Sequence, residues 1–529
     1  MDARLTAIAT MPLSPPPARE ASFTIDLPDE QATARFAAEI ANALEPGNLV
    51  TLSGDLGAGK TTFARALIRF LADDAELPVP SPTFTLVQNY ELPRFPLLHA
   101  DLYRLTGADE LTELGLDDLA GEAVILMEWP DRAGDWLPTD RIDLSFSLDA
   151  AQSLEHRMVR VTGHGALAVR VERLAALRDF LSAASLSRAV RHRMQGDAST
   201  RIYERIDNDG AVAILMNAAR RPDGPPVRDG KPYSAIAHLA EDVTPFVAMA
   251  DGLRAAGFAA PEIIAADLDH GFLLLEDFGN ETFVDGEPPA PIAERYALAT
   301  DLLVALHGMT LPTTLPVRGA QPYTIPPYDL GAFLIEAELL LDWYLPHRGV
   351  EASAELRKEF VALWQRALQP ALQGEQTWVM RDYHSPNLIW LRERGGVVCD
   401  GLAHVGLLDF QDALIGPAAY DVGSLLRDAR VDVPDALEAQ LLARYIDKRK
   451  ANDPAFDGDA FTAIYAVMVA QRATKILGIF ARLDRRDGKP QYLRHIPRVW
   501  RYLQGALAHP TLADLARWYK DHVPAFDRL

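Results

Sequence analysis

The sequence predicts an α/β protein in two parts, and three observations lead to this prediction. An apolar strand at 48–54 leads into a glycine-rich loop and then a helical segment that ends near Leu71. Farther along, polar side chains follow apolar strands in two loops, within 377–391 and 404–413. Between these regions, near 163–170, the mixture of strands and helices changes in pattern. Strands interspersed with helices are typical of α/β folds.

The composition restricts the class of protein. The 529 residues carry a formal net charge of −22, from 52 Lys and Arg against 74 Asp and Glu. Residues 1–165 hold 12 basic and 26 acidic side chains, a net charge of −14. This sign disfavours direct binding of nucleic acid through bulk charge, so any contact with nucleic acid is expected to be indirect only. At roughly 150 residues per domain, the length suggests more than one domain.

Cysteine content and hydropathy indicate the compartment. The single cysteine, Cys399, excludes an intrachain disulfide and fits a reducing environment. The first residues lack the charged and apolar segments of a signal peptide. The longest apolar runs fall short of the roughly 20 residues that a membrane span needs. We therefore expect a cytoplasmic protein with no membrane partner.

The elements of the first part are predicted in chain order from their spacing. Residues 1–20 contain a proline-rich run and are expected to form a flexible arm. Phe36, Ile40 and Leu44 recur at helical spacing, which predicts a helix over 30–44. Four further strands are expected, at 97–103, 123–129, 141–148 and 156–163.

The second part begins with a helix expected over about 172–184. Alternating segments then predict a β-hairpin that turns at Asp209-Gly210. A helix near 243–256 and a strand at 271–279 follow. After about residue 290 the chain is expected to be mainly helical.

The glycine-rich loop carries a phosphate-binding pattern. Residues 54–61 read Gly-Asp-Leu-Gly-Ala-Gly-Lys-Thr, which matches G-x-x-x-x-G-K-[ST]. Glycines let backbone N–H groups turn around phosphate oxygens, and the following helix directs its positive end at them. Lys60 is expected to reach the β and γ phosphates of ATP, and Thr61 to hold Mg²⁺. The predicted ATP contacts are Gly54, Asp55, Leu56, Gly57, Ala58, Gly59, Lys60, Thr61 and Thr62.

Such a loop needs an acidic partner for the metal ion and the attacking water. Asp101 and Glu128 both end predicted strands. We expect both to act in catalysis and as metal ligands, with Thr61 as the third metal ligand.

Four ordered motifs make residues 30–163 resemble the ATPase subunit of the bacterial machinery that forms threonylcarbamoyladenosine in tRNA (TsaE). The motifs are GDLGAGKTT (54–62), SPTFTLVQNY (81–90), HADLYRL (99–105) and MEWPDR (127–132). The resemblance implies a P-loop NTPase fold and association with TsaB- and TsaD-like subunits of the threonylcarbamoyl-transferase complex. It places Thr33 near the adenine, Thr83 and Thr85 in a switch-like loop, and Tyr103 and Trp129 in packing roles. The alternative is a stand-alone regulatory NTP switch.

The second part contains the spacing of a kinase catalytic loop. Asp382 and Asn387 form the pattern D-x-x-x-x-N, and Asp409 follows an apolar strand farther on. Asp382 is expected to accept the proton from an attacking hydroxyl as the catalytic base. Asn387 and Asp409 are expected to hold Mg²⁺ bound to ATP.

Residues 175–529 resemble the aminoglycoside-phosphotransferase branch of the protein-kinase-like fold. Within it they are most similar to kinases that phosphorylate the anomeric hydroxyl of N-acetylmuramate or N-acetylglucosamine in cell-wall recycling (AmgK-like). The motifs that carry this include GDASTRIYERI (196–206), LLLEDFG (273–279), MRDYHSPNLIWL (380–391) and LLDFQDALIGPAAYDVGSLLRDAR (407–430). The resemblance implies ATP contacts at Gly196, Ser199, Arg201 and Glu276. It places Asp421 and Ser424 behind the catalytic loop as supports.

This part departs from the kinase pattern in places. Met380 stands where kinases usually have His, and the expected strand lysine is absent from VAILMN (212–217). Arg201, Arg220 and Lys231 remain as alternative phosphate clamps. His384 is left open between touching substrate and bracing the loop, whereas Arg381 is expected to pair locally.

Together these patterns predict a bifunctional chain with one ATP site in each half. The alternatives for the second half are an aminoglycoside or choline-type kinase and a pseudokinase that regulates the ATPase. The predicted segments are an arm (1–20), a P-loop ATPase domain (21–165), a kinase-like N-lobe (170–285) and a kinase-like C-lobe (286–529).

Overall fold

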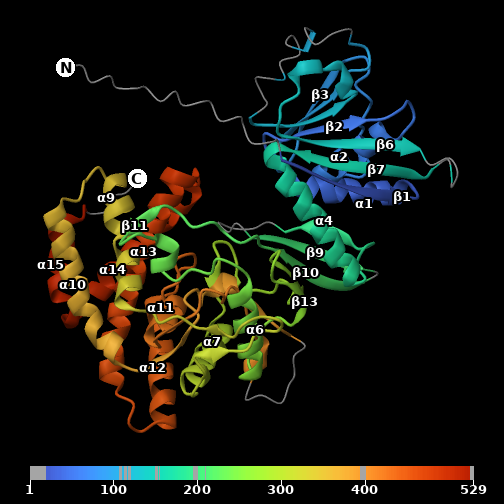
Figure 1. Cartoon of the computed structure of the whole chain (residues 1–529). Helices are drawn as coiled ribbons and strands as arrows, with labels where there is room; N and C mark the ends of the chain where they lie inside the picture. Colours follow the sequence, from blue (N-terminus) through green and yellow to red (C-terminus); the bar gives the residue numbers. More distant parts are fainter. Residues whose placement is uncertain are drawn as a thin grey trace, which may run out of the picture. The chain divides into compact units, whose positions relative to one another are not determined.

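Figure 1 shows the computed structural model of the chain. It describes residues 19–105, 110–111, 116, 121–148, 153, 155–194, 201–208, 210–392 and 401–524. Most of the expected arm, as well as Cys399 and the predicted turn residue Asp209, lie outside the described residues. The chain divides into two compact units: residues 1–197 with 202–212, and residues 198–201 with 213–529.

The first unit is built on a seven-stranded sheet with the order β1-β7-β6-β2-β5-β4-β3. Strands β6, β2, β5 and β4 run parallel, and the outer pairs are antiparallel. The strands are β1 (Glu20–Leu27), β2 (Leu49–Ser53), β3 (Val87–Glu91), β4 (Pro96–Asp101), β5 (Val124–Glu128), β6 (Arg141–Leu148) and β7 (Arg157–His164). Because parallel strands end at the same edge, their carboxyl ends bring polar side chains together there.

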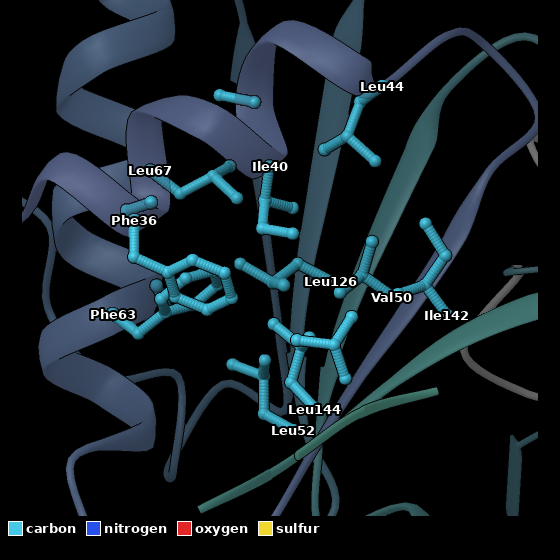
Figure 2. Packing of buried hydrophobic residues seen from close by; sticks show 14 of the residues in the cluster. Phe36, Ile40, Leu44, Val50, Leu52, Phe63, Leu67, Leu126, Ile142 and Leu144 are labelled. Atoms are coloured by element: carbon cyan, nitrogen blue, oxygen red, sulfur yellow. The ribbon is translucent and has the colours of Figure 1, made fainter. Parts of the chain in front are cut away.

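Two helices cover one face of this sheet. Helix α1 (Glu30–Ala43) begins where Asp29 accepts a 2.6 Å bond from the N–H of Ala32, and α2 begins at Lys60 (Lys60–Ala72). Their apolar faces pack on the sheet, as Figure 2 shows. The labelled core comprises Phe36, Ile40, Leu44, Val50, Leu52, Phe63, Leu67, Leu126, Ile142 and Leu144. A second apolar cluster, which includes Leu49, Leu98, Ile125 and Met127, is distinct from this core.

Helix α4 (Ala168–Ala183) belongs to this unit by its packing. Val171 and Leu174 are buried in the same core as α1 and α2. The sequence analysis placed this helix at the beginning of the kinase-like part. The structure instead packs it against the sheet of the first unit. Strands β8 (Val190–Arg193) and β9 (Ile202–Asn208) then pair antiparallel.

The second unit begins with an antiparallel ladder. Strand β14 (Phe272–Glu276) pairs with β10 (Ala211–Asn217) on one side and with β13 (Ile263–Asp267) on the other. Helix α6 (Thr244–Ala255), which follows the single-turn helix α5 (Tyr233–Ile236), packs against β13. Four residues of β14 are buried, which explains why the segment reads as a continuous apolar run.

Two small sheets separate the polar loops of this unit. Strand β19 (Gln376–Val379) pairs with β22 (Leu414–Pro417), and β20 (Leu388–Trp390) pairs with β21 (Val405–Leu407). The segment with Asp382 therefore runs from one sheet to the other.

After about residue 290 the second unit is mainly helical, as expected. The helices of eight or more residues there are α7 (Ala293–His307), α8 (Leu330–Ala337), α10 (Ala354–Gln373), α11 (Ala419–Leu426), α12 (Asp435–Asn452), α13 (Gly458–Asp487), α14 (Ile496–Leu507) and α15 (Ala513–His522). Among the described residues, α13 alone has the length and apolar composition to cross a membrane, and 83% of its apolar window is buried inside the protein. Its contacts with α11 and α14 make it the central helix of this unit.

Candidate functional sites

The loop between β2 and α2 has the conformation that its glycines allow. Gly54, Gly57 and Gly59 have φ of 130°, 81° and 108°, a region that side chains disfavour. A Cβ added at Gly54 would lie 2.3 Å from the carbonyl oxygen of Phe146. The loop therefore depends on glycine at the position where β2 ends.

Lys60 turns back into this loop. Its Nζ donates to the carbonyl oxygens of Gly54 (2.8 Å) and Asp55 (2.9 Å), and lies 3.8 Å from the centre of the Trp129 ring. Burial lowers the pKa of Lys60, whereas the carboxylates of Glu128 and Asp101 oppose the shift. The lysine thus places a positive charge within the loop.

Oxygen ligands meet at the carboxyl edge of the sheet. The Thr61 hydroxyl lies 3.0 Å from both carboxylate oxygens of Glu128, and Asp101 pairs with Glu128 in the strand register. Thr83 donates to Asp101 at 2.7 Å, which ties the loop after α2 to this edge. A hydroxyl and two carboxylates are the donor types that Mg²⁺ prefers.

His99 completes this edge, and the sequence reasoning missed it. Its Nε2 lies 3.0 Å from Glu128, and the side chain is fully buried. His99 stands two residues before Asp101 on β4, so both side chains belong to the same face of the strand. The alternation of side chains along this strand could have identified His99 from the sequence, because it places His99 on the same face as Asp101.

Other residues predicted in this half have defined surroundings in the structure. Leu56 is 79% exposed and Ala58 is buried. The hydroxyl of Thr33 donates to the carbonyl of Asp29 (3.1 Å) in the first turn of α1. The rings of Tyr103 and Trp129 pack with centres 5.1 Å apart.

The second site surrounds the segment between β19 and β20. Asn387 Nδ2 donates to the carbonyl oxygen of Asp382 (2.9 Å) and to Oδ2 of Asp409 (3.3 Å). The three residues predicted as base and metal ligands therefore converge. Arg381 and Asp409 have positive φ, 70° and 57°, so the backbone is constrained on both sides of the site.

Buried carboxylates hold this segment from behind. Asp421 accepts the backbone N–H groups of Met380 (2.6 Å) and Arg381 (2.9 Å). Burial raises the pKa of Asp421 to about 7, although both bonds favour the ionised form. Asp428 accepts bonds from the N–H (3.1 Å) and hydroxyl (2.6 Å) of Ser385. Asp421 thus lies where the sequence resemblance placed it.

Arg381 points into a buried ion-pair network. It donates to Glu336, which is fully buried and also accepts from Lys475 (2.8 Å). Tyr328 and Gln471 donate to the same carboxylate. Lys475 and Gln471 come from α13, residues to which the sequence reasoning gave no role.

The charges around the site set its protonation. Burial raises the pKa of Asp382, but Lys475, His384 and Arg472 outweigh it and the net shift is downward. Burial and the charge of Asp382 raise the pKa of Asp409. Asp382 is therefore held ionised, as a proton acceptor must be.

Arg201 is the candidate phosphate clamp that the structure places at the site. Its Nη1 lies 3.3 Å from Oδ1 of Asp409. Arg220 is 73% exposed and pairs with Glu241, and Lys231 is exposed in the strand β12 (Lys231–Pro232). Gly196 and Ser199 lie outside the described residues.

The end of β14 carries the remaining predicted nucleotide contact. Glu276 accepts the N–H of Glu262 (3.2 Å) and lies 3.7 Å from Arg254. Its exposed fraction of 29% leaves part of the carboxylate open to solvent.

Family comparisons match the two parts separately. Residues 27–158 match the family described as "Threonylcarbamoyl adenosine biosynthesis protein TsaE". Residues 190–457 match the phosphotransferase enzyme family to which aminoglycoside phosphotransferases belong.

Individual relatives agree with this division. A Caulobacter vibrioides protein named N-acetylmuramate/N-acetylglucosamine kinase is 38% identical over 68% of this chain and 98% of its own length. A Pseudomonas aeruginosa protein of the same name is 35% identical over 60% of this chain and 84% of its own. A Rickettsia bellii protein named tRNA threonylcarbamoyladenosine biosynthesis protein TsaE is 40% identical over 23% of this chain and 84% of its own.

The two sites and these matches lead to one assignment. The predicted α/β fold, with a P-loop part and a kinase-like part, is confirmed, and the second part is that of an enzyme that transfers phosphoryl groups to hydroxyls. The chain is a fusion that belongs to the TsaE family through its first part and to the phosphotransferase enzyme family through its second.

Proposed function

We propose that the second unit transfers the γ-phosphoryl group of ATP to the anomeric hydroxyl of N-acetylmuramate or N-acetylglucosamine. The convergence of Asp382, Asn387 and Asp409 is the observation that carries this proposal. The names of the Caulobacter and Pseudomonas relatives support the choice of sugar. The lowered pKa of Asp382 and the position of Arg201 beside Asp409 favour an active kinase over a pseudokinase.

In this proposal each residue has one task. Asp382 accepts the proton of the sugar hydroxyl as its oxygen attacks the γ-phosphorus. The bond from that phosphorus to the bridging oxygen breaks, and ADP leaves with its electron pair. Asn387 and Asp409 hold Mg²⁺, which neutralises charge on the phosphate oxygens. Arg201 binds the phosphates in place of the absent strand lysine, and Glu276 borders the adenine.

The test uses the full chain with ATP, Mg²⁺ and either sugar. We expect a sugar phosphate, identified by its mass, and a loss of roughly 10³-fold or more in kcat when Asp382→Asn removes the base. An aminoglycoside and choline serve as competing acceptors. Phosphorylation of one of these, with both sugars left unmodified, would contradict the proposal.

We propose further that the first unit hydrolyses ATP in support of threonylcarbamoyladenosine formation in tRNA. Lys60 binds the β and γ phosphates, while Thr61, Glu128 and Asp101 hold Mg²⁺ and the attacking water. Thr33 borders the adenine. The Thr61–Glu128 contact at the end of β5 is the observation that carries this proposal. The chain would act with TsaB- and TsaD-like subunits in the cytoplasm.

Reconstitution tests this second activity. The full chain is mixed with TsaB- and TsaD-like subunits, unmodified tRNA, threonine, bicarbonate and ATP, and the modified nucleoside is quantified. Thr61→Ala removes a metal ligand, so we expect at least a roughly 10-fold loss of modification. Ser147→Ala is the matched control, because its hydroxyl bonds only the carbonyl of Met158 among the contacts described. Modification that does not require the chain would exclude this role.

A further inference from the structure

Gln411 joins two carboxylates of the second site. Its side-chain nitrogen, Nε2, donates to Oδ1 of Asp409 (2.9 Å) and to Oδ2 of Asp412 (3.3 Å). The residue is buried, with an exposed fraction of 2%. In the kinase motif D-F-G this position is a glycine, which has no side chain that could make either bond. Gln411 therefore provides a link that the kinase motif itself does not contain.

The two carboxylates determine the orientation of the Gln411 amide. Its other polar atom, Oε1, is buried and accepts no hydrogen bond from the described residues. The opposite orientation would set this oxygen, which only accepts, against carboxylate oxygens that also only accept. A buried oxygen without a partner costs free energy, so the two bonds from Nε2 must outweigh that cost.

The Asp409 carboxylate is held at both of its oxygens. Oδ1 accepts from Nε2 of Gln411 (2.9 Å) and from Nη1 of Arg201 (3.3 Å). Oδ2 accepts from Nδ2 of Asn387 (3.3 Å). The bond from Gln411 is the shortest of the three. An aspartate side chain can rotate about two bonds, so these hydrogen bonds set the direction in which its carboxylate points.

Asp412 connects the Gln411 amide to another part of the same unit. Its Oδ1 accepts the backbone N–H of Ala240 (2.6 Å), just before α6 begins. Its Oδ2 accepts from Gln411. Burial and neighbouring carboxylates raise the pKa of Asp409, whereas the bond from Gln411 lowers it. Gln411 thus lies between two negative charges and donates to both.

We infer that Gln411 is a positioning residue for the metal ion of the second site: it fixes the direction of the Asp409 carboxylate for binding Mg²⁺, and Asp412 anchors its amide. The inference rests on the proposed kinase function and deepens it. Mg²⁺ requires nearly ideal octahedral geometry, so a ligand that rotates binds it less well. Loss of a side chain that hydrogen-bonds a metal ligand typically costs roughly 10- to 100-fold in metal affinity or activity.

The first test measures how much Mg²⁺ increases the affinity for ADP. Calorimetric titration gives the dissociation constant of ADP in Mg²⁺ and in EDTA. Every chain is full-length and carries Lys60→Ala, which we expect to remove nucleotide binding from the first unit. Gln411→Met keeps the size of the side chain and removes both donors. We expect it to lower the Mg²⁺-dependent gain in ADP affinity by roughly 10-fold and to change the affinity in EDTA much less.

Kinetics give a second readout. The Mg²⁺ concentration for half-maximal sugar phosphorylation should rise by roughly 10- to 100-fold in Gln411→Met, with little change in KM for the sugar. Asp412→Ala should cause a smaller rise. The double variant should behave as Gln411→Met does, because Asp412 acts through the same amide. Fully additive effects would overturn the role of Asp412 as the anchor.

A matched control and the remaining outcomes separate positioning from a general effect on folding. Gln471 is also buried, and its Nε2 lies 3.3 Å from Glu336, which is not a proposed metal ligand. Gln471→Met should therefore leave the Mg²⁺-dependent gain unchanged. For Gln411→Met, an unchanged gain, or equal losses of ADP affinity in Mg²⁺ and in EDTA, would overturn the inference.

Failure of the proposed function is distinguishable from failure of this inference. If the unaltered chain phosphorylates neither sugar, the proposed acceptor is wrong, and the calorimetric comparison still decides the role of Gln411. If the Lys60→Ala chain shows no Mg²⁺-dependent gain in ADP affinity, both proposals for the second site are overturned.

Discussion

Arg201 places a cation at the second site, whose neighbouring strand lacks the expected lysine. The strand VAILMN has no lysine, yet Arg201 places a guanidinium 3.3 Å from Asp409. An arginine is always charged and has several donors, so it can contact a carboxylate and a phosphate together. The second site thus has a cation beside Asp409, the carboxylate that we propose as a metal ligand.

We expect Arg201→Ala to lower kcat/KM for ATP in sugar phosphorylation by roughly 10²-fold, because the phosphates lose their cation. Arg201→Lys should recover part of this loss, since it retains the charge. Arg220→Ala is the control, because Arg220 is 73% exposed. Initial rates of sugar phosphorylation at varied ATP concentrations measure kcat/KM for ATP. An unaltered kcat/KM in Arg201→Ala would show that another residue binds the phosphates.

Motif residues could be predicted from the sequence because their spacing is local. Lys60 and Thr61 follow their glycines directly, and Asp382 precedes Asn387 by five positions. His99 and Lys475 could not be predicted in the same way. Their partners, Glu128 and Glu336, are brought to them by strand pairing and helix packing across long separations.

At the scale of elements, helix α13 links the interior of the second unit to its site. Residues 465–478 of this helix are buried without interruption, and Gln471 and Lys475 reach Glu336 on α8. Arg381 then joins the catalytic loop to the same carboxylate. Three elements thus share one buried negative charge, and removal of that charge leaves two cations uncompensated.

We expect Glu336→Gln to destabilise the protein by about 3 to 5 kcal/mol at pH 7, the usual cost of breaking a buried ion pair. Burial opposes ionisation, yet Arg381 and Lys475 lower the pKa of Glu336 to about 2, below its usual value of 4.5. Its stabilising contribution is therefore present above about pH 4.5 and is lost as the pH falls toward 2.

Urea unfolding followed by tryptophan fluorescence measures this effect. The difference in unfolding free energy between the unaltered chain and Glu336→Gln should narrow from pH 5 to pH 3. Glu359→Gln replaces an exposed acid on α10 and should change stability little. A difference that widens with acid would show that Glu336 is not the ionised partner.

Elements with a strong apolar pattern were predictable, and edge strands were not. Strands β5 and β6 lie within a residue of the expected ranges, because most of their buried positions are apolar. Strand β3 has no fully buried residue, so its sequence, VQNYE, shows little apolar patterning. Strand β1 lies in a segment for which no strand was expected, and its order comes from pairing with β7.

For the whole molecule, two independent sets of motifs predicted two parts, and each part has its own core. The position of the division was harder to predict. Helix α4 has a weak pattern and follows the last strand closely, so nothing local indicates which core receives Val171 and Leu174. That choice depends on the surface formed by β1 and β7, which exists only once the sheet has assembled.

The inward turn of Lys60 has a consequence for which nucleotides enter the first unit. The ammonium group is already coordinated by two carbonyl oxygens of its own loop. An incoming ligand must exchange oxygen for oxygen, so it must offer several anionic oxygens at the depth of the loop. A di- or triphosphate can offer these oxygens. A monophosphate offers fewer, so Lys60 would keep its hydrogen bonds to the carbonyl oxygens of the loop. We therefore expect the loop to bind nucleoside di- and triphosphates more tightly than monophosphates.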